Sequence, residues 1–186
     1  MKVLKFGGTS VGSSKNINSV INILENYGET DTIVCVVSAV GGITDKLLLA
    51  GKQAQSKDRA FVDTFSGIKE RHYTIIKELN PTNNKGILNY IDDRLSALYS
   101  LLEGIYLINE LSPKTSDKLV SYGELLSSYI IAETMKNRGL SAERKNSHEL
   151  IITNSNFTKA EVDYKITDKN IQDYFKSASQ QITILP

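Results

Sequence analysis

The stretch that decides the fold is Lys5-Phe-Gly-Gly-Thr-Ser-Val-Gly12, which directly follows the short apolar run Val3-Leu4. This order predicts a buried strand that ends in a glycine turn. Glycines let the backbone approach a ligand without an intervening Cβ, and successive exposed N–H groups form a concave anion site. Lys5 adds a mobile positive charge. The stretch therefore indicates a phosphate-binding turn, and the alternative is a structural strand-to-helix turn capped by Ser or Thr.

The residues after this turn have the spacing of a helix and lead to a second strand. Between residues 14 and 27, apolar side chains recur at helical spacing at Ile17, Val20, Ile21 and Leu24. Residues 32–38 form a near-continuous run of β-formers, which is typical of a parallel strand buried on both faces. The order predicts a right-handed βαβ unit.

A second glycine turn, Gly41-Gly42, follows the second strand. Thr44 or Asp45 is predicted to cap the helix that comes next. The carboxyl ends of parallel strands meet at one edge of an open α/β sheet, and ligands bind at that edge. We therefore expect the two glycine turns to lie together in one site.

The middle of the chain is predicted to be helical and to carry no cofactor. Helices over 58–79 and 86–111 are separated by Pro81 and a polar run. They should form an antiparallel hairpin that packs beside the sheet. His72 is predicted to lie on the surface of the first of these helices.

A further helix is predicted over 116–137, and its polar residues share one face: Asp117, Ser121, Glu124 and Ser128. This polar stripe has two explanations: it faces water, or it lines a small polar cavity into which Glu124 projects. Gly123 weakens a helix interior by about 1 kcal/mol relative to Ala. That cost favours the second explanation, with a neighbouring backbone or ligand in close approach.

The last part of the chain returns to the sheet. We predict a short hairpin strand over 161–165, a helix over 168–177 and a strand of the same sheet over 182–185. A central strand left unpaired near Leu185 would pair with another chain. A homo-oligomer is therefore predicted.

Composition excludes some partners and favours one compartment. The 186 residues include 22 basic and 21 acidic side chains, so there is no electrostatic footprint for nucleic acid or a membrane surface. There is neither a signal-peptide core nor an apolar stretch long enough to span a bilayer, so a cytoplasmic location is predicted. Cys35 is the single cysteine, so no internal disulfide can form, and its apolar surroundings predict burial. No residues are assigned as metal ligands.

Three segments resemble the N-terminal signatures of the aspartate kinases, within the amino acid kinase fold. They are Lys5-Phe-Gly-Gly-Thr-Ser-Val-Gly12, Val36-Val-Ser-Ala-Val-Gly-Gly-Ile-Thr-Asp45 and Leu119-Val-Ser-Tyr-Gly-Glu-Leu-Leu-Ser127. The resemblance spans residues 1–185 and has the family's order and spacing. It implies an α/β three-layer sandwich with a mostly parallel central sheet, extended by the helical hairpin.

The resemblance also implies site residues and a reaction. Lys5 would be catalytic and contact the ATP phosphates, beside a phosphate cradle of Gly7, Gly8, Thr9 and Ser10. Aspartate would be bound by Ser38, Gly42, Thr44 and Glu124, with Glu124 pairing with the α-ammonium group. The implied reaction converts ATP and L-aspartate to ADP and 4-phospho-L-aspartate, with Mg²⁺ bridging phosphates. It is the first step of lysine, threonine and methionine biosynthesis.

One part of the family pattern is absent, and one part departs from it. The glycine-rich Thr-Thr-Leu-Gly-Arg-Gly-Gly-Ser-Asp type motif is missing. Residues 1–186 are therefore expected to be the amino-acid-binding N-terminal lobe, truncated before the nucleotide-binding half and inactive alone. The parent would be a monofunctional aspartate kinase or one fused to a homoserine dehydrogenase. Asn146-Ser-His-Glu-Leu-Ile151 replaces an Asp-Ala-Arg-like segment, and His148 is predicted to face solvent.

Two other functions remain open at this point. Carbamate, acetylglutamate, glutamate and uridylate kinases share the architecture and its glycine turns, although Glu124 in its Ser-Tyr-Gly-Glu setting favours aspartate. The second alternative is a non-catalytic binding or assembly module in which the glycine turns are structural.

Overall fold

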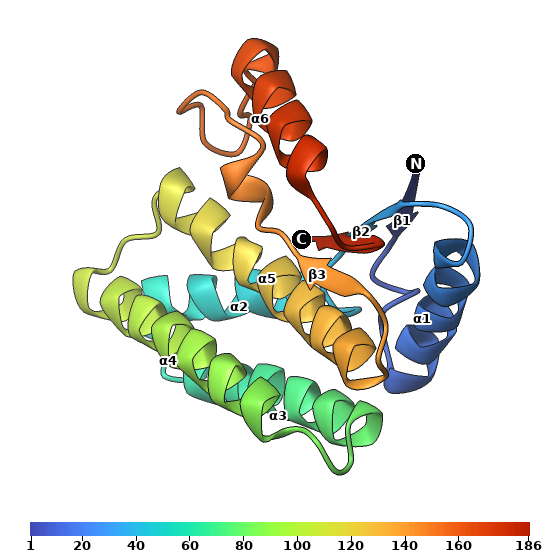
Figure 1. Ribbon diagram of the computed structural model, residues 1–186. Helices are drawn as coiled ribbons and strands as arrows, with labels where there is room; N and C mark the ends of the chain where they lie inside the picture. The colour runs from blue at the N-terminus through green and yellow to red at the C-terminus, as the bar shows by residue number, and fades with distance from the viewer.

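A computed structural model describes all residues from 1 to 186, and its centre is one parallel sheet (Figure 1). The strands lie in the order β1-β2-β4-β3, and every neighbouring pair is parallel. Their bounds are β1 Lys2–Phe6, β2 Ile33–Val37, β3 Ala142–Arg144 and β4 Ile182–Leu185. The helices are α1 Ser14–Gly28, α2 Ile43–Gln55, α3 Phe61–Leu79, α4 Lys85–Ile108, α5 Pro113–Asn137 and α6 Tyr164–Ser177, and a 3₁₀ turn spans Ser147–Glu149.

The two faces of the sheet are covered by different helices, which gives the predicted three layers. Successive side chains of a strand point to opposite faces. On β3, Arg144 contacts Ser128 of α5, whereas its neighbour Glu143 contacts Tyr174 of α6. Helix α1 contacts α5 and lies with it on the first face. The α/β sandwich predicted from sequence is confirmed, and the sheet is parallel throughout.

The antiparallel helical hairpin is confirmed, but it packs on other helices rather than beside the sheet as predicted, and it lies beyond α5 from the sheet (Figure 1). Arg59, just before α3, pairs with Glu103 near the end of α4, whereas Tyr73, later in α3, contacts Asp92 near the start of α4. Because later residues of α3 meet earlier residues of α4, the two helices are antiparallel. Helix α2 contacts both helices of this hairpin as well as α5.

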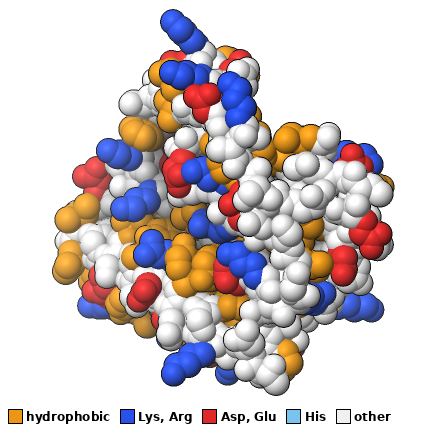
Figure 2. Space-filling model, viewed as in Figure 1, with side chains coloured by type: hydrophobic (Ala, Val, Ile, Leu, Met, Phe, Trp, Pro, Cys, Tyr) orange, Lys and Arg blue, Asp and Glu red, His pale blue; other side chains and the backbone are white.

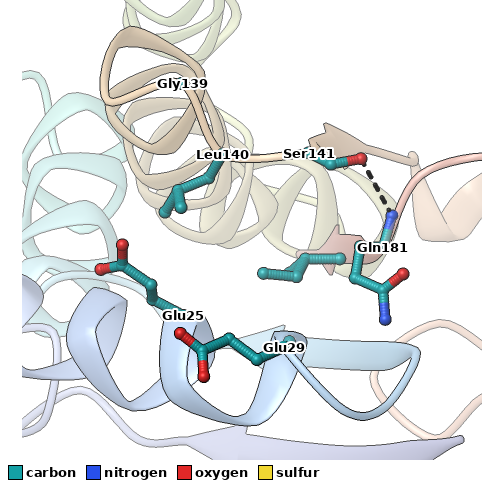
Figure 3. Close-up of a pocket in the computed structure, with 8 residues that line it drawn as sticks. Glu25, Glu29, Gly139, Leu140, Ser141 and Gln181 are labelled. Atoms are coloured by element: carbon teal, nitrogen blue, oxygen red, sulfur yellow. Dashed lines mark hydrogen bonds between the residues drawn. The ribbon is translucent and has the colours of Figure 1, made fainter.

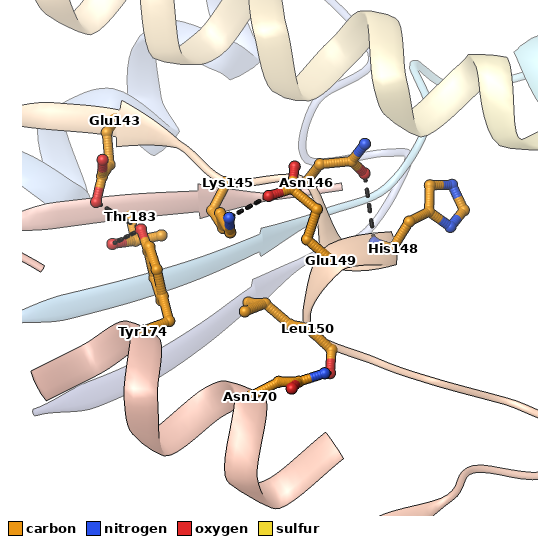
Figure 4. A network of polar contacts seen from close by, with 9 residues as sticks. All are labelled: Glu143, Lys145, Asn146, His148, Glu149, Leu150, Asn170, Tyr174 and Thr183. Carbon is orange, nitrogen blue, oxygen red and sulfur yellow. Dashed lines mark hydrogen bonds and ion pairs between the residues drawn. The ribbon is translucent and has the colours of Figure 1, made fainter. Parts of the chain in front are cut away.

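Helix α6 contacts the sheet and the segment after β3 through polar side chains (Figure 4). The Tyr174 hydroxyl contacts Glu143 and lies 3.5 Å from the Thr183 hydroxyl. The Asn170 side chain donates to the backbone oxygen of Leu150 at 3.4 Å. Only Thr167 is buried within this helix, so α6 forms a thin layer compared with the helices on the other face.

Two local predictions are wrong because capping differs from expectation. Helix α2 begins at Ile43 after Gly42, whose φ of 78° is left-handed, and no side chain caps it. Thr44 and Asp45 therefore lie inside the first turn. The strand predicted over 161–165 is reduced to an isolated bridge between Thr153 and Val162. Asp163 accepts a hydrogen bond from the Ile166 N–H at 3.1 Å, and this cap starts α6 instead.

His72 is wrongly predicted to be a surface residue. Its side chain is fully buried, and its Nδ1 lies 2.8 Å from the Ile68 carbonyl oxygen. The physical reason is helical periodicity, since His72 shares a face with Ile68, Ile75 and Ile76, all of which are in the core. Cys35 is buried as predicted, and burial raises the pKa of its thiol to about 12.

The strand predicted to be unpaired has two partners. β4 lies between β2 and β3, and the open edges of the sheet belong to β1 and β3. The three-residue strand β3, Ala-Glu-Arg, has no apolar alternation, so its pairing with β4 could not be expected from sequence. Self-association remains a prediction without this support. No helix combines the length and the apolar character that crossing a membrane requires.

Candidate functional site

The two glycine turns lie against each other at the carboxyl edge of the sheet. Phe6 and Val37 are partners in the β1–β2 register, and the Ser38 N–H donates to the Phe6 oxygen at 3.1 Å. A Cβ placed on Gly8 would lie 3.2 Å from the Ala39 oxygen, and one on Gly41 would lie 3.1 Å from the Gly8 oxygen. The turns are thus in backbone contact that a side chain would obstruct, and the predicted juxtaposition is confirmed.

The first turn presents a run of unpaired backbone donors. No acceptor within the chain receives a hydrogen bond from the amides of Gly7, Gly8, Thr9 and Ser10. Two carbonyl groups of the turn, by contrast, accept hydrogen bonds: the Gly7 oxygen from the Val11 N–H at 3.2 Å, and the Thr9 oxygen from the Asn16 side chain at 2.8 Å. Free successive N–H groups of this kind form an anion-binding concavity.

Lys5 is an unpaired cation two residues before the turn. Its side chain is exposed and forms no ion pair with any carboxylate of the chain. A Cβ on Gly7 would meet no atom within 4 Å, so space is open next to the turn. A lysine without a protein partner beside free amides is suited to bind a phosphate group.

Helix α5 brings Glu124 to the second turn. The Oε1 atom of Glu124 accepts a hydrogen bond from the Ala39 N–H at 3.3 Å, and no other residue of the chain bonds to this carboxylate. A Cβ on Gly123 would lie 2.6 Å from the Ala39 Cβ, so the helix touches the turn at this glycine. A close approach at Gly123 is thus present, but it is made by side chains, those of Ala39, Ile43 and Leu47, rather than by the neighbouring backbone or ligand that the sequence predicted.

The polar stripe of α5 faces the protein along most of its length. Ser128 is fully buried and accepts from Arg144 Nε at 2.9 Å. Asp117 and Ser121 line a polar cavity of about 330 Å³, together with His148, which is exposed as predicted. Glu124 does not line this cavity but is directed to Ala39. The stripe thus lines a cavity at Asp117 and Ser121, but the prediction that Glu124 projects into that cavity is wrong.

The remaining predicted residues lie around the second turn. Ser38 follows β2 directly, and its carbonyl oxygen accepts from the Ser127 hydroxyl at 2.7 Å. Gly42 has open space where a Cβ would be, and Thr44 is half-buried in the first turn of α2. The structure thus brings Ser38, Glu124 and the glycine turns together. Ser127 was missed, although it lies three residues after Glu124, on the same side of the helix.

Other features of the molecule lie apart from this site. A cavity of about 260 Å³ at the opposite end of the sheet is lined by Glu25, Glu29, Gly139 and Gln181, among others (Figure 3). No group of three or more His, Cys, Asp or Glu side chains could hold a metal ion. Charged side chains of both signs are interspersed over the face seen in Figure 2, with apolar groups between them.

Comparison with known proteins identifies the family. The model of the amino acid kinase family matches residues 1–186. The chain is 36% identical over 164 residues to aspartokinase 1 of Arabidopsis thaliana, a chloroplastic protein, covering 86% of this chain and 28% of that relative. It is 28% identical to the chloroplastic bifunctional aspartokinase/homoserine dehydrogenase 2 of Zea mays, covering 98% and 20%.

Solved structures give the same picture. E. coli aspartokinase III in complex with aspartate and ADP superposes with a TM-score of 0.86 at 25% identity, covering 98% of this chain and 40% of that one. The aspartate kinase of Clostridium acetobutylicum has a TM-score of 0.75 at 26% identity, covering 99% and 38%. The chain thus spans well under half the length of these relatives. Its sequence and its fold both place it in the amino acid kinase family.

Proposed function

We propose that residues 1–186 are the amino-acid-binding N-terminal lobe of an aspartate kinase catalytic domain. The parent enzyme would transfer the γ-phosphoryl group of ATP to the side-chain carboxylate of L-aspartate, giving 4-phospho-L-aspartate and ADP. The observation that carries this proposal is the contact between two glycine turns, one with four free amides beside Lys5 and the other bonded to Glu124. The similarity to aspartokinases on both sequence and structure supports it.

In the proposed reaction, these residues position the substrates and stabilise the charge that develops on the phosphoryl group. Phosphoryl transfer develops charge on the transferred oxygens, and preorganised donors and cations stabilise that charge. Lys5 and the amides of Gly7, Gly8, Thr9 and Ser10 are assigned to the phosphates. Oε2 of Glu124 is free of partners in the chain, so it is assigned to the α-ammonium group of aspartate. Ser38, Gly42 and Thr44 are assigned to the rest of the amino acid.

Residues 1–186 form no group of three or more His, Cys, Asp or Glu side chains that could hold a metal ion by itself. Mg²⁺ commonly binds through substrate phosphates and one or two carboxylates. We therefore assign no ligand for it, and no step through it, to residues 1–186. The nucleotide-binding half, with a catalytic aspartate and a substrate-binding arginine, is proposed to lie outside them. A role in lysine, threonine and methionine biosynthesis and a cytoplasmic location belong to the same proposal, although the plant relatives are chloroplastic.

The test is phosphorylation by the full-length protein. ADP release is measured with L-aspartate, L-glutamate, N-acetylglutamate, carbamate or UMP as acceptor, and aspartate is expected to be the substrate. Lys5→Ala should lower kcat by about 10²-fold or more, which is the usual decrease in rate when a group that stabilises the transition state is removed. Lys52→Ala is the control, since Lys52 is exposed and unpaired at the far end of α2. Equal turnover in both variants would favour a binding module, and a different acceptor would identify another kinase of this fold.

A further inference from the structure

One peptide group links the second glycine turn to α5. The Ser38 carbonyl and the Ala39 N–H belong to the same planar unit, and both are bonded to side chains of α5. The Ser127 hydroxyl donates to the Ser38 oxygen at 2.7 Å, and the Ala39 N–H donates to Glu124 Oε1 at 3.3 Å. In a trans peptide these two groups point in opposite directions and rotate together. Rotation of this peptide would therefore break both bonds at once.

Of the two hydrogen bonds to this peptide, the one from Ser127 is the shorter. Its side chain is fully buried, and its hydroxyl carries a single proton. The alternative acceptor, the Glu124 carbonyl oxygen, is 3.2 Å away, so the shorter contact to Ser38 takes the proton. Gly123 lies one turn earlier and allows the helix to touch Ala39, which brings both bonding side chains within reach.

The longer bond is the one that orients Glu124. No residue of the chain other than Ala39 bonds to this carboxylate, and it forms no ion pair. The direction of the Ala39 N–H therefore sets the direction of the free Oε2 atom. Since Ser127 fixes the peptide plane, it also fixes that N–H.

We propose that Ser127 is a positioning residue of the amino acid site, which acts on the Glu124 carboxylate through the Ser38–Ala39 peptide. This rests on the proposed function, in which Glu124 binds the α-ammonium group of aspartate. Ser127 itself touches no substrate. Its hydroxyl holds the Glu124 carboxylate in its binding orientation before the ligand binds. Preorganisation of this kind improves affinity because less conformational entropy is lost on binding.

The experiment compares two adjacent buried serines in the full-length protein. Ser127→Ala removes the bond to Ser38, whereas Ser128→Ala removes an equally buried hydroxyl that contacts Arg144 and Leu125 instead. Ser127→Ala should raise the KM for L-aspartate roughly two- to tenfold, the range that one neutral hydrogen bond is worth. The KM for ATP should stay unchanged. Ser128→Ala should change neither value by more than about twofold.

A second measurement does not depend on turnover. Hydrogen exchange of the amides of residues 38–42, without ligand, should be faster in Ser127→Ala than in Ser128→Ala, because the peptide is released. Ser127→Cys, which keeps a weak donor of similar size, should lie between Ser127→Ala and the wild type. Equal exchange in the two alanine variants would overturn the positioning role. Faster exchange with no phosphorylation of aspartate by the wild type would retain the positioning role and reject the proposed substrate.

Discussion

His72 is a buried histidine whose Nε2 has no hydrogen-bond partner. Burial lowers its pKa from the ordinary 6.5 to about 4, against the smaller opposing effect of the Ile68 carbonyl. The unfolded chain therefore binds a proton at a higher pH than the folded one. The contribution of neutral His72 to the free energy of unfolding is therefore fully present above pH 6.5, and it is lost as the pH falls from 6.5 towards 4.

We expect the free energy of unfolding to fall by about 3 kcal/mol over this window through His72 alone. Urea unfolding at pH 7.0 and at about pH 4.5 measures the loss. In His72→Leu this component should be absent, so its stability should depend less on pH. His148→Gln is the control, since His148 is exposed. The same pH dependence in wild type and His72→Leu would contradict the expectation.

Cys35 should be unreactive while the protein is folded. It lies in β2 with no exposed surface, and burial raises the pKa of its thiol to about 12. The thiolate is the reactive form of cysteine. In the folded protein, reagents do not reach the Cys35 sulfur, and the thiol stays protonated. With a chromogenic disulfide reagent at pH 8, labelling should follow the unfolding rate and become immediate in denaturant. Rapid labelling of the native protein would show that β2 is exposed.

At the candidate site, the residues proposed from sequence are those with recognisable chemistry, and the residue that the sequence did not reveal is proposed to act through the backbone. Lys5, the glycines and Glu124 were predicted because charge and Gly patterns are visible in the sequence. Ser127 was not, because its partner is a carbonyl of a distant element, and any residue has a carbonyl. The free amides of the first turn were expected from its glycines, and the structure shows which four they are.

At the scale of the helices, two glycines should respond in opposite directions to the same substitution. Gly123 of α5 has no room, since a Cβ would lie 2.6 Å from the Ala39 Cβ, whereas Gly104 of α4 has no atom within 4 Å of that position. Gly123→Ala should destabilise the protein by about 1–3 kcal/mol through overpacking. Gly104→Ala should stabilise it by roughly 0.5–1 kcal/mol. Thermal unfolding of both variants checks the pair, and a stable Gly123→Ala would show that α5 can move away from the turn.

Elements with long periodic patterns and strands with apolar runs were predicted, whereas the three-residue strand β3 was not. The apolar stripe of α4 and the four core residues of α1 identify their helices without ambiguity. β3 has three residues and no alternation, so it was missed. At the start of α2, the left-handed Gly42 took the place of the expected side-chain cap. At 161–165, Asp163 offered a cap that residue-by-residue β propensity did not reveal.

For the whole molecule, the two faces of the sheet should differ in local stability. The first face carries the core and the long helices, whereas α6 buries only Thr167 over the second. An apolar hollow of about 230 Å³ remains between α6 and the sheet, lined by Val3, Val36, Leu150 and Phe175, among others. Segments with few buried contacts open with lower free energy than the core.

Amides of α6 and of residues 151–163 should therefore exchange with deuterium faster than those of α3, α4 and α5. Exchange followed by mass spectrometry on native protein would resolve these segments. Tyr174→Phe, which loses the contacts to Glu143 and Thr183, should accelerate exchange in α6 and leave α4 unchanged. Uniform protection across all helices would show that α6 belongs to the same cooperative unit as the core.

The strand order has a consequence for synthesis on the ribosome. β4 separates β2 from β3 in the sheet, yet it follows both in the chain, and β3 has no other partner. While the chain emerges, β1, β2 and the helices up to α5 can assemble, but one side of β2 stays open and β3 stays unplaced. Such distant pairings form slowly because a long loop must close. A nascent chain would thus expose the unpaired edge of the apolar strand Ile33–Val37 until residues 182–185 have been synthesised. Chaperones that bind extended apolar segments would have the most time to bind at this strand.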